Sequence, residues 1–249
     1  MTGRSFVAVG VDGCPAGWVY VERPVDRRGR PRGGLAAAAV APRFADVVNA
    51  FAASIAGGRA AIMVDMPIGL AETGRRACEG AVRRALGPRR SSVFSSPRRP
   101  MLAMADYDAA NRWGKERSAG GGLSRQAWNI VPKIREVDAV MTPGLQSAIG
   151  EAHPEAAFAR LRGAPCEQPK RTAGGAAERR AALGVAGLDA GRILRALRER
   201  FPRKADVADD DVLDACVLSL TAAARLEGTA VVHGDGARDA RGLRMEIWA

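Results

Sequence analysis

One short run of apolar residues limits the fold of this chain more than any other feature. Residues 60–65 read AAIMVD, and all five residues before the aspartate are apolar. Because side chains alternate along a strand, such a run predicts a strand buried on both faces, in the middle of a sheet that helices cover on either side. A chain of 249 residues, 47% of them hydrophobic, can bury one such core and carry a large insertion. We therefore expect an α/β protein.

The segments before this strand complete one half of the predicted sheet. Residues 5–11, 17–22 and 35–41 are short apolar runs bounded by Gly and Pro, which indicates three antiparallel strands. Residues 23–34, RPVDRRGRPRGG, are polar and basic and are expected to form a solvated hairpin loop. Residues 43–58 place Phe and Val at helical spacing and end in a glycine pair, which predicts one amphipathic helix.

The segments after this strand predict one large insertion and the rest of the core. Residues 71–146 are basic and contain helical patterns, so we interpret them as an insertion within a single domain that spans residues 1–249. Residues 147–152 are the expected fifth strand, and helices are predicted from His153 and near residues 190–201. The last helix begins at DDDVLDACVLSL and is apolar on nearly every side, which is typical of a helix buried against a sheet.

Charge and cysteine content restrict the class of function. The formal net charge is +11, which favours a polyanionic partner such as DNA or RNA, although the richness in Ala, Gly and Arg also fits a nucleotide bias of the coding sequence. The four cysteines form no C-x-x-C pair, so neither a zinc site nor a disulfide framework is predicted. The sequence shows no membrane-spanning run and no secretory signal, and we expect a cytoplasmic protein that does not contact a membrane.

Acidic residues follow the buried segments at positions that the topology would bring together. Asp12 shares a strand face with Ala8 and Gly10, and Asp65 ends the apolar run described above. Both are predicted to be the last residue of a strand, at the edge where α/β sheets bind ligands. Asp211 and Asp214 share one face of the last helix. Four buried carboxylates would repel one another unless divalent cations neutralise them, and oxygen ligands favour Mg²⁺ or Mn²⁺.

Each aspartate also has a purely structural interpretation. Asp12-Gly13 is a favoured pair for a hairpin turn, and Asp65 before Met-Pro could cap a strand end. Asp211 opens a helix, where helix capping and the helix dipole both favour an acid. A purely structural interpretation fits Asp214 least, since burying an unpaired carboxylate inside an apolar helix costs free energy.

Several motifs together resemble one family of proteins. The sequence is similar to predicted nucleases with an RNase H-like fold, a family first catalogued as a domain of unknown function. The resemblance runs from about residue 7 to 248 and rests on VGVDGCPAGWV, VDMPIGL, RRSSVFSSPRRP, SRQAWNIVPKIREVD, EAHPEAAFARL and DDVLDACVLSLTA. The last motif is also remotely similar to the D-x-x-D helix of RuvC-type Holliday-junction resolvases. The fold thus implied is a mixed five-stranded sheet, three antiparallel strands followed by parallel ones, flanked by helices.

The resemblance also implies an activity and roles for the four aspartates. It predicts a metal-dependent nuclease, an endonuclease or exonuclease, that hydrolyses phosphodiester bonds with two Mg²⁺ or Mn²⁺ ions roughly 4 Å apart. Asp12 would bridge both ions, Asp65 would hold one, and Asp211 with Asp214 would hold the other. Asp65 stands where the resolvases have a glutamate, one bond longer. Since resolvases act as dimers, the resemblance also allows a homodimer.

Three residues after the fifth strand are further candidates for the catalytic site. Glu151 and His153 share a face at the end of that strand, and His153 or Glu155 could contact a metal ion or the attacking water. An alternative is an ordinary helix start, since Pro154-Glu155 is a common pair in a first helical turn.

The insertion carries a second set of candidates, for contact with nucleic acid. Arginine pairs alternate with serines in RRSSVFSSPRR, and both residue types suit phosphate contacts, although a solvated basic helix would look alike. The residues predicted to bind nucleic acid are Arg89, Arg90, Arg98, Arg99, Lys133, Arg135 and Lys170.

Two other classes of function fit part of the pattern. An actin-like or sugar-kinase-like phosphotransferase shares the strand order and the first aspartate. Such proteins carry a hydroxyl-bearing phosphate turn after that aspartate, where this chain reads GCPAG, and they need a second core. A nucleic-acid-binding protein that has kept the scaffold and lost catalysis is the other alternative, and the presence of all four acids argues against it.

Overall fold

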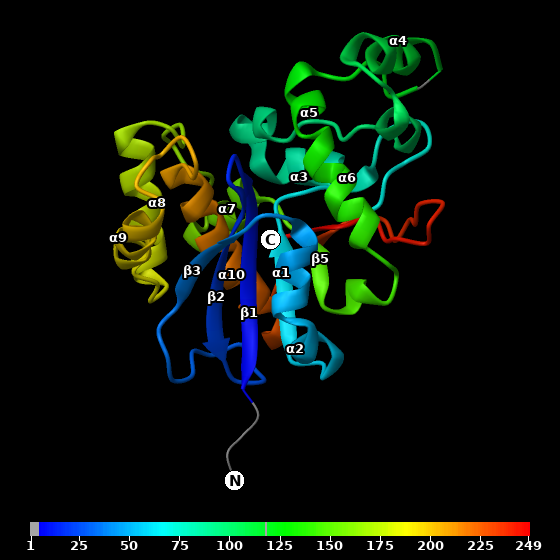
Figure 1. The fold of residues 1–249 in the computed structure, drawn as a ribbon. Helices are drawn as coiled ribbons and strands as arrows, with labels where there is room; N and C mark the ends of the chain where they lie inside the picture. The colour runs from blue at the N-terminus through cyan, green and yellow to red at the C-terminus, as the bar shows by residue number, and fades with distance from the viewer. Residues whose placement is uncertain (1–4, 118) are drawn as a thin grey trace.

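A five-stranded sheet runs through the middle of the protein in the computed structural model, which describes residues 5–117 and 119–249 (Figure 1). Its strands are β1 (Phe6–Cys14), β2 (Gly17–Val25), β3 (Ala37–Ala41), β4 (Ala60–Val64) and β5 (Ile149–Glu151). Their order is β3-β2-β1-β4-β5. The β1–β2 and β2–β3 pairs are antiparallel, whereas the β1–β4 and β4–β5 pairs are parallel. The predicted mixed five-stranded sheet is therefore confirmed.

Helices cover both faces of this sheet (Figure 1). One face carries α7 (Pro154–Arg162), α8 (Ala173–Val185), α9 (Ala190–Arg200) and α10 (Asp209–Glu227). The other face carries α1 (Phe44–Ala50), α2 (Ala52–Ala56) and α6 (Val131–Val140). A separate hairpin pairs β6 (Val232–His233) with β7 (Ile247–Trp248). No helix of the described residues is both long and apolar enough to cross a lipid bilayer.

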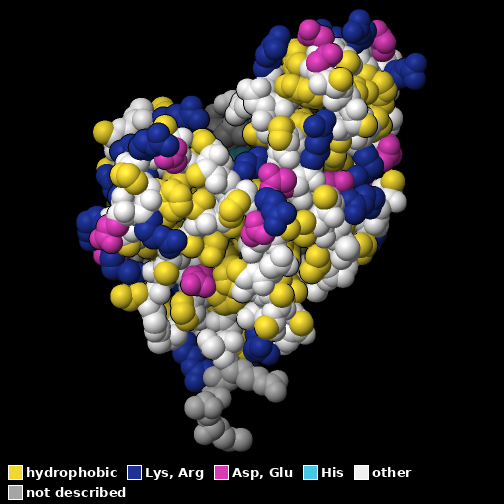
Figure 2. All heavy atoms as spheres, viewed as in Figure 1, with side chains coloured by type: hydrophobic (Ala, Val, Ile, Leu, Met, Phe, Trp, Pro, Cys, Tyr) yellow, Lys and Arg dark blue, Asp and Glu magenta, His cyan; other side chains and the backbone are white. Residues whose placement is uncertain are grey.

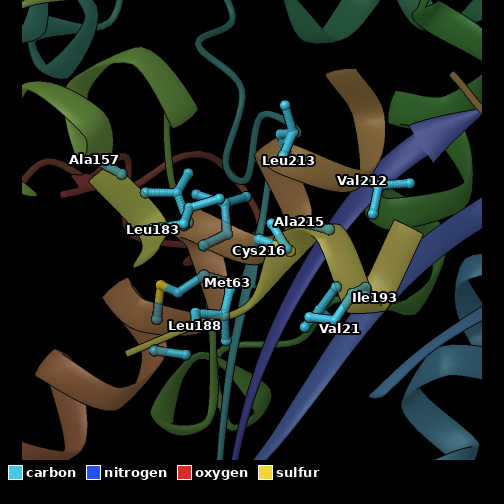
Figure 3. Packing of buried hydrophobic residues seen from close by; sticks show 14 of the residues in the cluster. Val21, Met63, Ala157, Leu183, Leu188, Ile193, Val212, Leu213, Ala215 and Cys216 are labelled. Carbon is cyan, nitrogen blue, oxygen red and sulfur yellow. The ribbon is translucent and has the colours of Figure 1, made fainter. Parts of the chain in front are cut away.

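Strand alternation divides the core into two apolar clusters. In β4, Ala61 and Met63 pack under α10, whereas Ile62 and Val64 pack under α1 and α6. The cluster under α10 also receives residues of α7, α8 and α9, as Figure 3 shows. Asp65 continues the alternation of Ala61 and Met63 and is thereby directed to the α10 side.

The contact between β1 and α10 depends on a glycine. A Cβ atom on Gly10 would lie 2.0 Å from the carbonyl oxygen of Ala215 and 2.3 Å from the amide nitrogen of Ser219, both in the backbone of α10. Only a residue without a side chain lets the helix backbone approach the strand this closely. The close packing brings the first turns of α10 next to the carboxyl end of β1.

The structure corrects the predicted strand limits near Asp12. β1 continues to Cys14, which pairs with Gly17, so Asp12 lies inside the strand opposite Val19 and is not its last residue. The turn falls at Pro15 and Ala16, which excludes the interpretation of Asp12 as a hairpin-turn residue. β4 ends at Val64, one residue before Asp65.

The structure also corrects other predicted limits. The helix predicted over residues 43–58 is two helices, because Phe51 leaves helical geometry with φ −109° and ψ 9° to place its ring against Tyr20. β2 extends to Val25, which is buried, so the loop predicted from residue 23 starts later. β3 and β5 are shorter than residues 35–41 and 147–152, since both are edge strands with one pairing neighbour.

Residues 71–146 lie between β4 and β5 in sequence and near the carboxyl end of the sheet in space (Figure 1). Their α-helices are α3 (Ala77–Leu86), α4 (Tyr107–Arg117), α5 (Arg125–Asn129) and α6. Short 3₁₀ helices lie at Gly87–Ser92, Arg99–Ala103 and Leu145–Ser147, and the last of these ends one residue beyond the predicted insertion. A small apolar cluster of Met101, Ala110, Leu123 and Ala127 holds the distal part together. Residue 118 of the predicted insertion, and residues 1–4 of the predicted domain, lie outside the described residues.

Candidate metal centre

Asp12 and Asp65 lie side by side because of the register between β1 and β4. Val11 pairs with Val64, and the amide of Asp65 donates a hydrogen bond of 3.0 Å to the carbonyl of Val11. Both aspartates therefore point to the α10 side of the sheet. Asp12 accepts a hydrogen bond of 2.7 Å from the amide of Gly13. No amide of the described backbone donates to the carboxylate of Asp65, so the structure shows no capping role for this residue.

Asp214 is the third acid next to Asp12 and Asp65, and it comes from helix α10, which covers this face of the sheet. It lies in the second turn of α10 with 1% of its surface exposed. One carboxylate oxygen from each of Asp12, Asp65 and Asp214 lies within 4.8 Å of the other two. The three predicted ligands thus come from two parallel strands and one helix that are far apart in sequence.

Asp211 has a different position from the other three aspartates. Its carboxylate accepts a hydrogen bond of 3.1 Å from the amide of Ala208, just before α10, so the capping interpretation of this residue is confirmed. It is half-buried and is not part of the three-residue group. It is close enough for its charge to raise the pKa of Asp12.

Burial, with added repulsion between neighbouring acids, raises the pKa of each of the three clustered aspartates and of Asp211. Burial raises the pKa of Asp65 to about 8, with a further contribution from the charge of Asp214. Burial also raises the pKa of Asp12 well above its usual value, followed by the charges of Asp65 and Asp214. The pKa of Asp211 rises to about 6, mainly through burial. Such shifts mark a site where negative charge is concentrated and not fully compensated.

Among the described residues, Lys170 is the one lysine whose ammonium contacts the clustered aspartates. Its Nζ donates a hydrogen bond of 2.7 Å to Oδ2 of Asp214 and lies 3.7 Å from Asp210. Burial alone would lower the pKa of Lys170, but the charges of Asp214 and Asp12 outweigh it and raise the pKa. The sequence predicted Lys170 as a nucleic-acid contact, whereas the structure places its ammonium on a predicted metal ligand.

The donor set fits a divalent cation. Three carboxylates offer hard oxygen ligands, which suit Mg²⁺ or Mn²⁺. Oδ1 of Asp214 is buried and has no hydrogen-bond partner among the described residues. A buried carboxylate oxygen without a partner is costly, and a bound cation would satisfy it. Asp12, Asp65 and Asp214 could therefore hold a metal ion.

Glu151 is committed to a buried ion pair. Arg76 donates to both of its carboxylate oxygens, at 2.6 and 2.7 Å, and the amide of Ile68 donates a third hydrogen bond at 2.8 Å. Arg76 also pairs with Glu79 at 3.0 Å. This network joins the end of β5 to the start of the insertion. Sequence reasoning missed Arg76 and Glu79, for which an Arg-x-x-Glu spacing at the start of a helix was the available signal.

His153 caps a helix. Its Nδ1 accepts a hydrogen bond of 3.4 Å from the amide of Ala156, and its Nε2 lies 3.3 Å from the carbonyl oxygen of Ser92. Burial lowers the pKa of His153 to about 4, so the ring is neutral near pH 7. Both nitrogens are thus engaged, and the helix-start interpretation is the one that the structure shows.

Glu155 pairs with an arginine and also lines a cavity next to the clustered aspartates. One of its oxygens accepts a hydrogen bond from the buried Arg179, while the other, Oε2, is buried without a partner among the described residues. The cavity has a volume of about 290 Å³. Its other lining residues include Asp65, Arg89, Phe94, His153, Lys170 and Asp214. Glu155 therefore opens to the same space as two of the three clustered aspartates.

The predicted nucleic-acid contacts differ in accessibility. Arg90 is exposed, and Arg89 is half-buried in the wall of the cavity beside Asp65. Arg98 is 1% exposed and donates to the carbonyl of Gly74 at 2.9 Å. Arg99 pairs with Asp138 at 3.0 Å and with Asp239.

Lys133 and Arg135 also have partners within the protein. Nζ of Lys133 donates to the carbonyl of Gly17 at 2.6 Å and lies 4.6 Å from the centre of the Trp18 ring. Nε of Arg135 donates to the carbonyl of Leu102 at 2.7 Å. Of the seven predicted contacts, Arg90 is the one whose side chain has no hydrogen-bond or ion-pair partner among the described residues. Arg89 lines the cavity and donates a hydrogen bond of 3.3 Å to the carbonyl of Gln168.

The fold and this site define an α/β protein with a buried carboxylate group at the carboxyl end of a mixed sheet. The chain belongs to the family described as protein of unknown function (DUF429), whose model matches residues 10–238. This range includes all of the clustered aspartates and Lys170. Comparison with curated proteins and with solved structures gives no match.

Proposed function

We propose that this protein is a metal-dependent nuclease on an RNase H-like fold, which hydrolyses phosphodiester bonds of DNA or RNA with two Mg²⁺ or Mn²⁺ ions. The observation that carries the proposal is the convergence of Asp12, Asp65 and Asp214, with one oxygen of each within 4.8 Å of the others. Acids on two strands and a helix at the carboxyl edge of a sheet are the arrangement that the resemblance to RuvC-type resolvases implies.

The proposal assigns a role to each acid. As in the resolvases that the sequence resembles, Asp12 would bridge the two ions, Asp65 would hold one, and Asp214 with Asp211 would hold the other. Ions bound there would supply a nucleophilic water at neutral pH and neutralise charge on the phosphate. Binding requires the carboxylates to be ionised, so the raised pKa values of Asp65 and Asp211 would fall when a cation replaces the protons.

The surroundings of the acids support a polyanionic substrate. Arg89 lines the same cavity as Asp65 and Asp214. A second cavity, of about 420 Å³, shares Lys170 with it. Its charged lining residues are the four cations Lys170, Arg171, Arg180 and Lys204 and the two acids Asp209 and Asp210. Figure 2 shows Lys and Arg side chains on both sides of a hollow between the surface of α8 and α9 and the surface of the insertion. Cations around an acidic site attract phosphates while the acids hold metal.

The direct experiment is cleavage of a substrate panel. Purified protein is incubated with Mg²⁺ or Mn²⁺ and with single-stranded, duplex and branched DNA and RNA. We expect cleavage of at least one substrate, abolished by EDTA and reduced at least about a hundredfold in Asp12→Asn and in Asp214→Asn. Asp108→Asn, an exposed acid on α4, is the matched control and should cleave like the wild type.

Three outcomes would contradict the proposal. The first is absence of cleavage across the panel. The second is equal cleavage by the wild type and Asp214→Asn, which would indicate a contaminating nuclease. The third is turnover of ATP in the same samples without cleavage, which would favour the phosphotransferase alternative instead.

A further inference from the structure

A buried arginine without an acidic partner lies at the other end of the sheet from the metal centre. Arg23 belongs to β2, pairs with Ala8 of β1, and shares a strand face with Val21 and Val25, which pack under α10. It is 7% exposed, and no hydrogen bond or ion pair joins its side chain to another described residue. Burial lowers the pKa of Arg23, and no carboxylate offsets this effect. A largely desolvated guanidinium without an acidic partner would gain from a bound anion, so Arg23 is a candidate anion ligand.

The Arg23 side chain faces a cavity that gathers two further arginines. The cavity has a volume of about 320 Å³, at the lower end of the range for small-molecule sites. Arg30 and Arg160 line it together with Arg23, and Glu227 is the one acid in its lining. Arg160 donates a hydrogen bond to the carbonyl of Thr229, which fixes its guanidinium at the rim.

One wall of this cavity is apolar and belongs to two helices. Ala157 and Leu161 of α7 line it together with Val217, Leu220 and Ala224 of α10. Thr221 also lines the cavity, and its hydroxyl donates a hydrogen bond of 3.4 Å to the carbonyl of Val217. Apolar side chains together with arginines in one lining suit a ligand that has both an anionic group and a less polar body.

The loop that carries Arg30 is held rigidly against α10. The amides of Arg28 and Arg30 donate to Oδ1 of Asp26 at 2.8 and 3.0 Å, and the amide of Asp26 donates to the carbonyl of Arg30 at 2.8 Å. Gly29 has φ +74°, and a Cβ atom there would lie 2.1 Å from the carbonyl oxygen of Ala223. The loop predicted to be solvated thus has its tip in contact with the helix, and it presents Arg30 to the cavity in a preformed arrangement.

We propose that this cavity binds a small organic phosphate, with the phosphate group held by Arg23, Arg30 and Arg160. Three guanidinium groups against one carboxylate leave a formal charge of +2, which matches a phosphate monoester dianion and exceeds what a single carboxylate would neutralise. Guanidinium groups also present paired donors that suit phosphate oxygens. The site is separate from the metal centre, since Asp12 lies four residues farther along β1 than Ala8, roughly 13 Å away.

The test measures binding and thermal stabilisation with defined probes. Inorganic phosphate, adenosine 5′-monophosphate, adenosine and acetate are titrated into the full chain at constant ionic strength, with EDTA present. We expect saturable binding and a raised melting temperature with phosphate and with the monophosphate, tighter for the latter. Adenosine or acetate giving the same response as the monophosphate would overturn the proposal, and so would no response to any phosphate.

Variants locate the site. Arg30→Gln changes an exposed residue and should fold normally, whereas Arg23→Met removes the buried guanidinium; each should weaken phosphate binding at least about tenfold, as expected for losing a charged hydrogen bond. Arg27→Gln, in the same loop but outside the cavity lining, is the matched control and should bind like the wild type. Equal binding by Arg30→Gln and Arg27→Gln would contradict the assignment. Asp214→Asn should bind phosphate normally, which separates this test from that of the nuclease proposal.

Discussion

Replacing Lys170 by methionine tests whether its ammonium is the resident counter-charge of the acidic group. At 2.7 Å, the attraction between Nζ and Oδ2 of Asp214 is about 6 kcal/mol for an effective dielectric constant of about 20. Desolvation offsets much of it, and breaking a fully buried pair costs about 3–5 kcal/mol. The Lys170 side chain is 35% exposed, so solvent screening reduces the expected loss to about 2 kcal/mol. For a chain of 249 residues this lowers the melting temperature by roughly 4–8 °C.

The same substitution should strengthen metal binding. Nζ of Lys170 lies 2.7 Å from Oδ2 of Asp214, so it would lie roughly 5 Å from a cation that this oxygen binds. At that distance two unit positive charges repel each other by about 3 kcal/mol at an effective dielectric constant of about 20. Removing a cation from such a site should lower the Kd for Mn²⁺ at least about tenfold, even after screening. Titration calorimetry measures this Kd, and denaturation with and without Mn²⁺ shows that the metal restores the lost stability.

A matched control separates the local effect from the change in net charge. Lys204→Met removes the same charge at an exposed side chain that pairs with Asp209. It should change the melting temperature by less than about 2 °C and leave the Kd for Mn²⁺ unchanged. If Lys170→Met and Lys204→Met respond alike to Mn²⁺, Lys170 does not compete with metal and the reasoning is wrong.

Three further predictions concern the frame of the site. Gly10→Ala should destabilise the fold by about 3 kcal/mol or more, because its Cβ meets the α10 backbone, whereas Gly184→Ala, in an open helical position, should stabilise by about 0.5–1 kcal/mol; urea denaturation compares them. The folded pKa of Asp65, about 8, is raised, so the folded state binds a proton that the unfolded state releases. Without divalent ions, the wild type should therefore lose stability relative to Asp65→Asn as the pH rises from about 4 to about 8, and parallel melting curves would contradict this. Arg76→Met should cost about 3–5 kcal/mol and the double variant with Glu151→Leu clearly less, as a double-mutant cycle measures.

Local patterns were sufficient to predict the central part of the fold and the three clustered acids. The apolar run 60–64 marked a strand covered on both faces, and alternation placed Asp65 and Asp12 on the face that α10 covers. Asp214 stood out because a carboxylate inside an apolar helix needs a partner. These inferences depend on periodicities of a few residues, which the sequence displays directly.

The partners of these acids could not be predicted, because they come from distant segments. Lys170 is 44 positions from Asp214, and Arg76 is 75 positions from Glu151. No local periodicity relates such residues, and a basic residue outside a regular element looks the same whether it faces solvent or a buried acid. The extension of β1 past Asp12 was missed for a similar reason, since its last residues are held by pairing with β2.

The close contact between α10 and Gly10 also fixes the distance between the metal centre and the arginine-lined cavity. This helix carries Asp214 near its start and Ala224, in the wall of the arginine-lined cavity, ten residues later, a rise of about 15 Å. The helix cannot slide along β1 without moving a side chain into the space that only a glycine leaves open. The spacing between the two sites along α10 is therefore fixed by the contact of its backbone with Gly10.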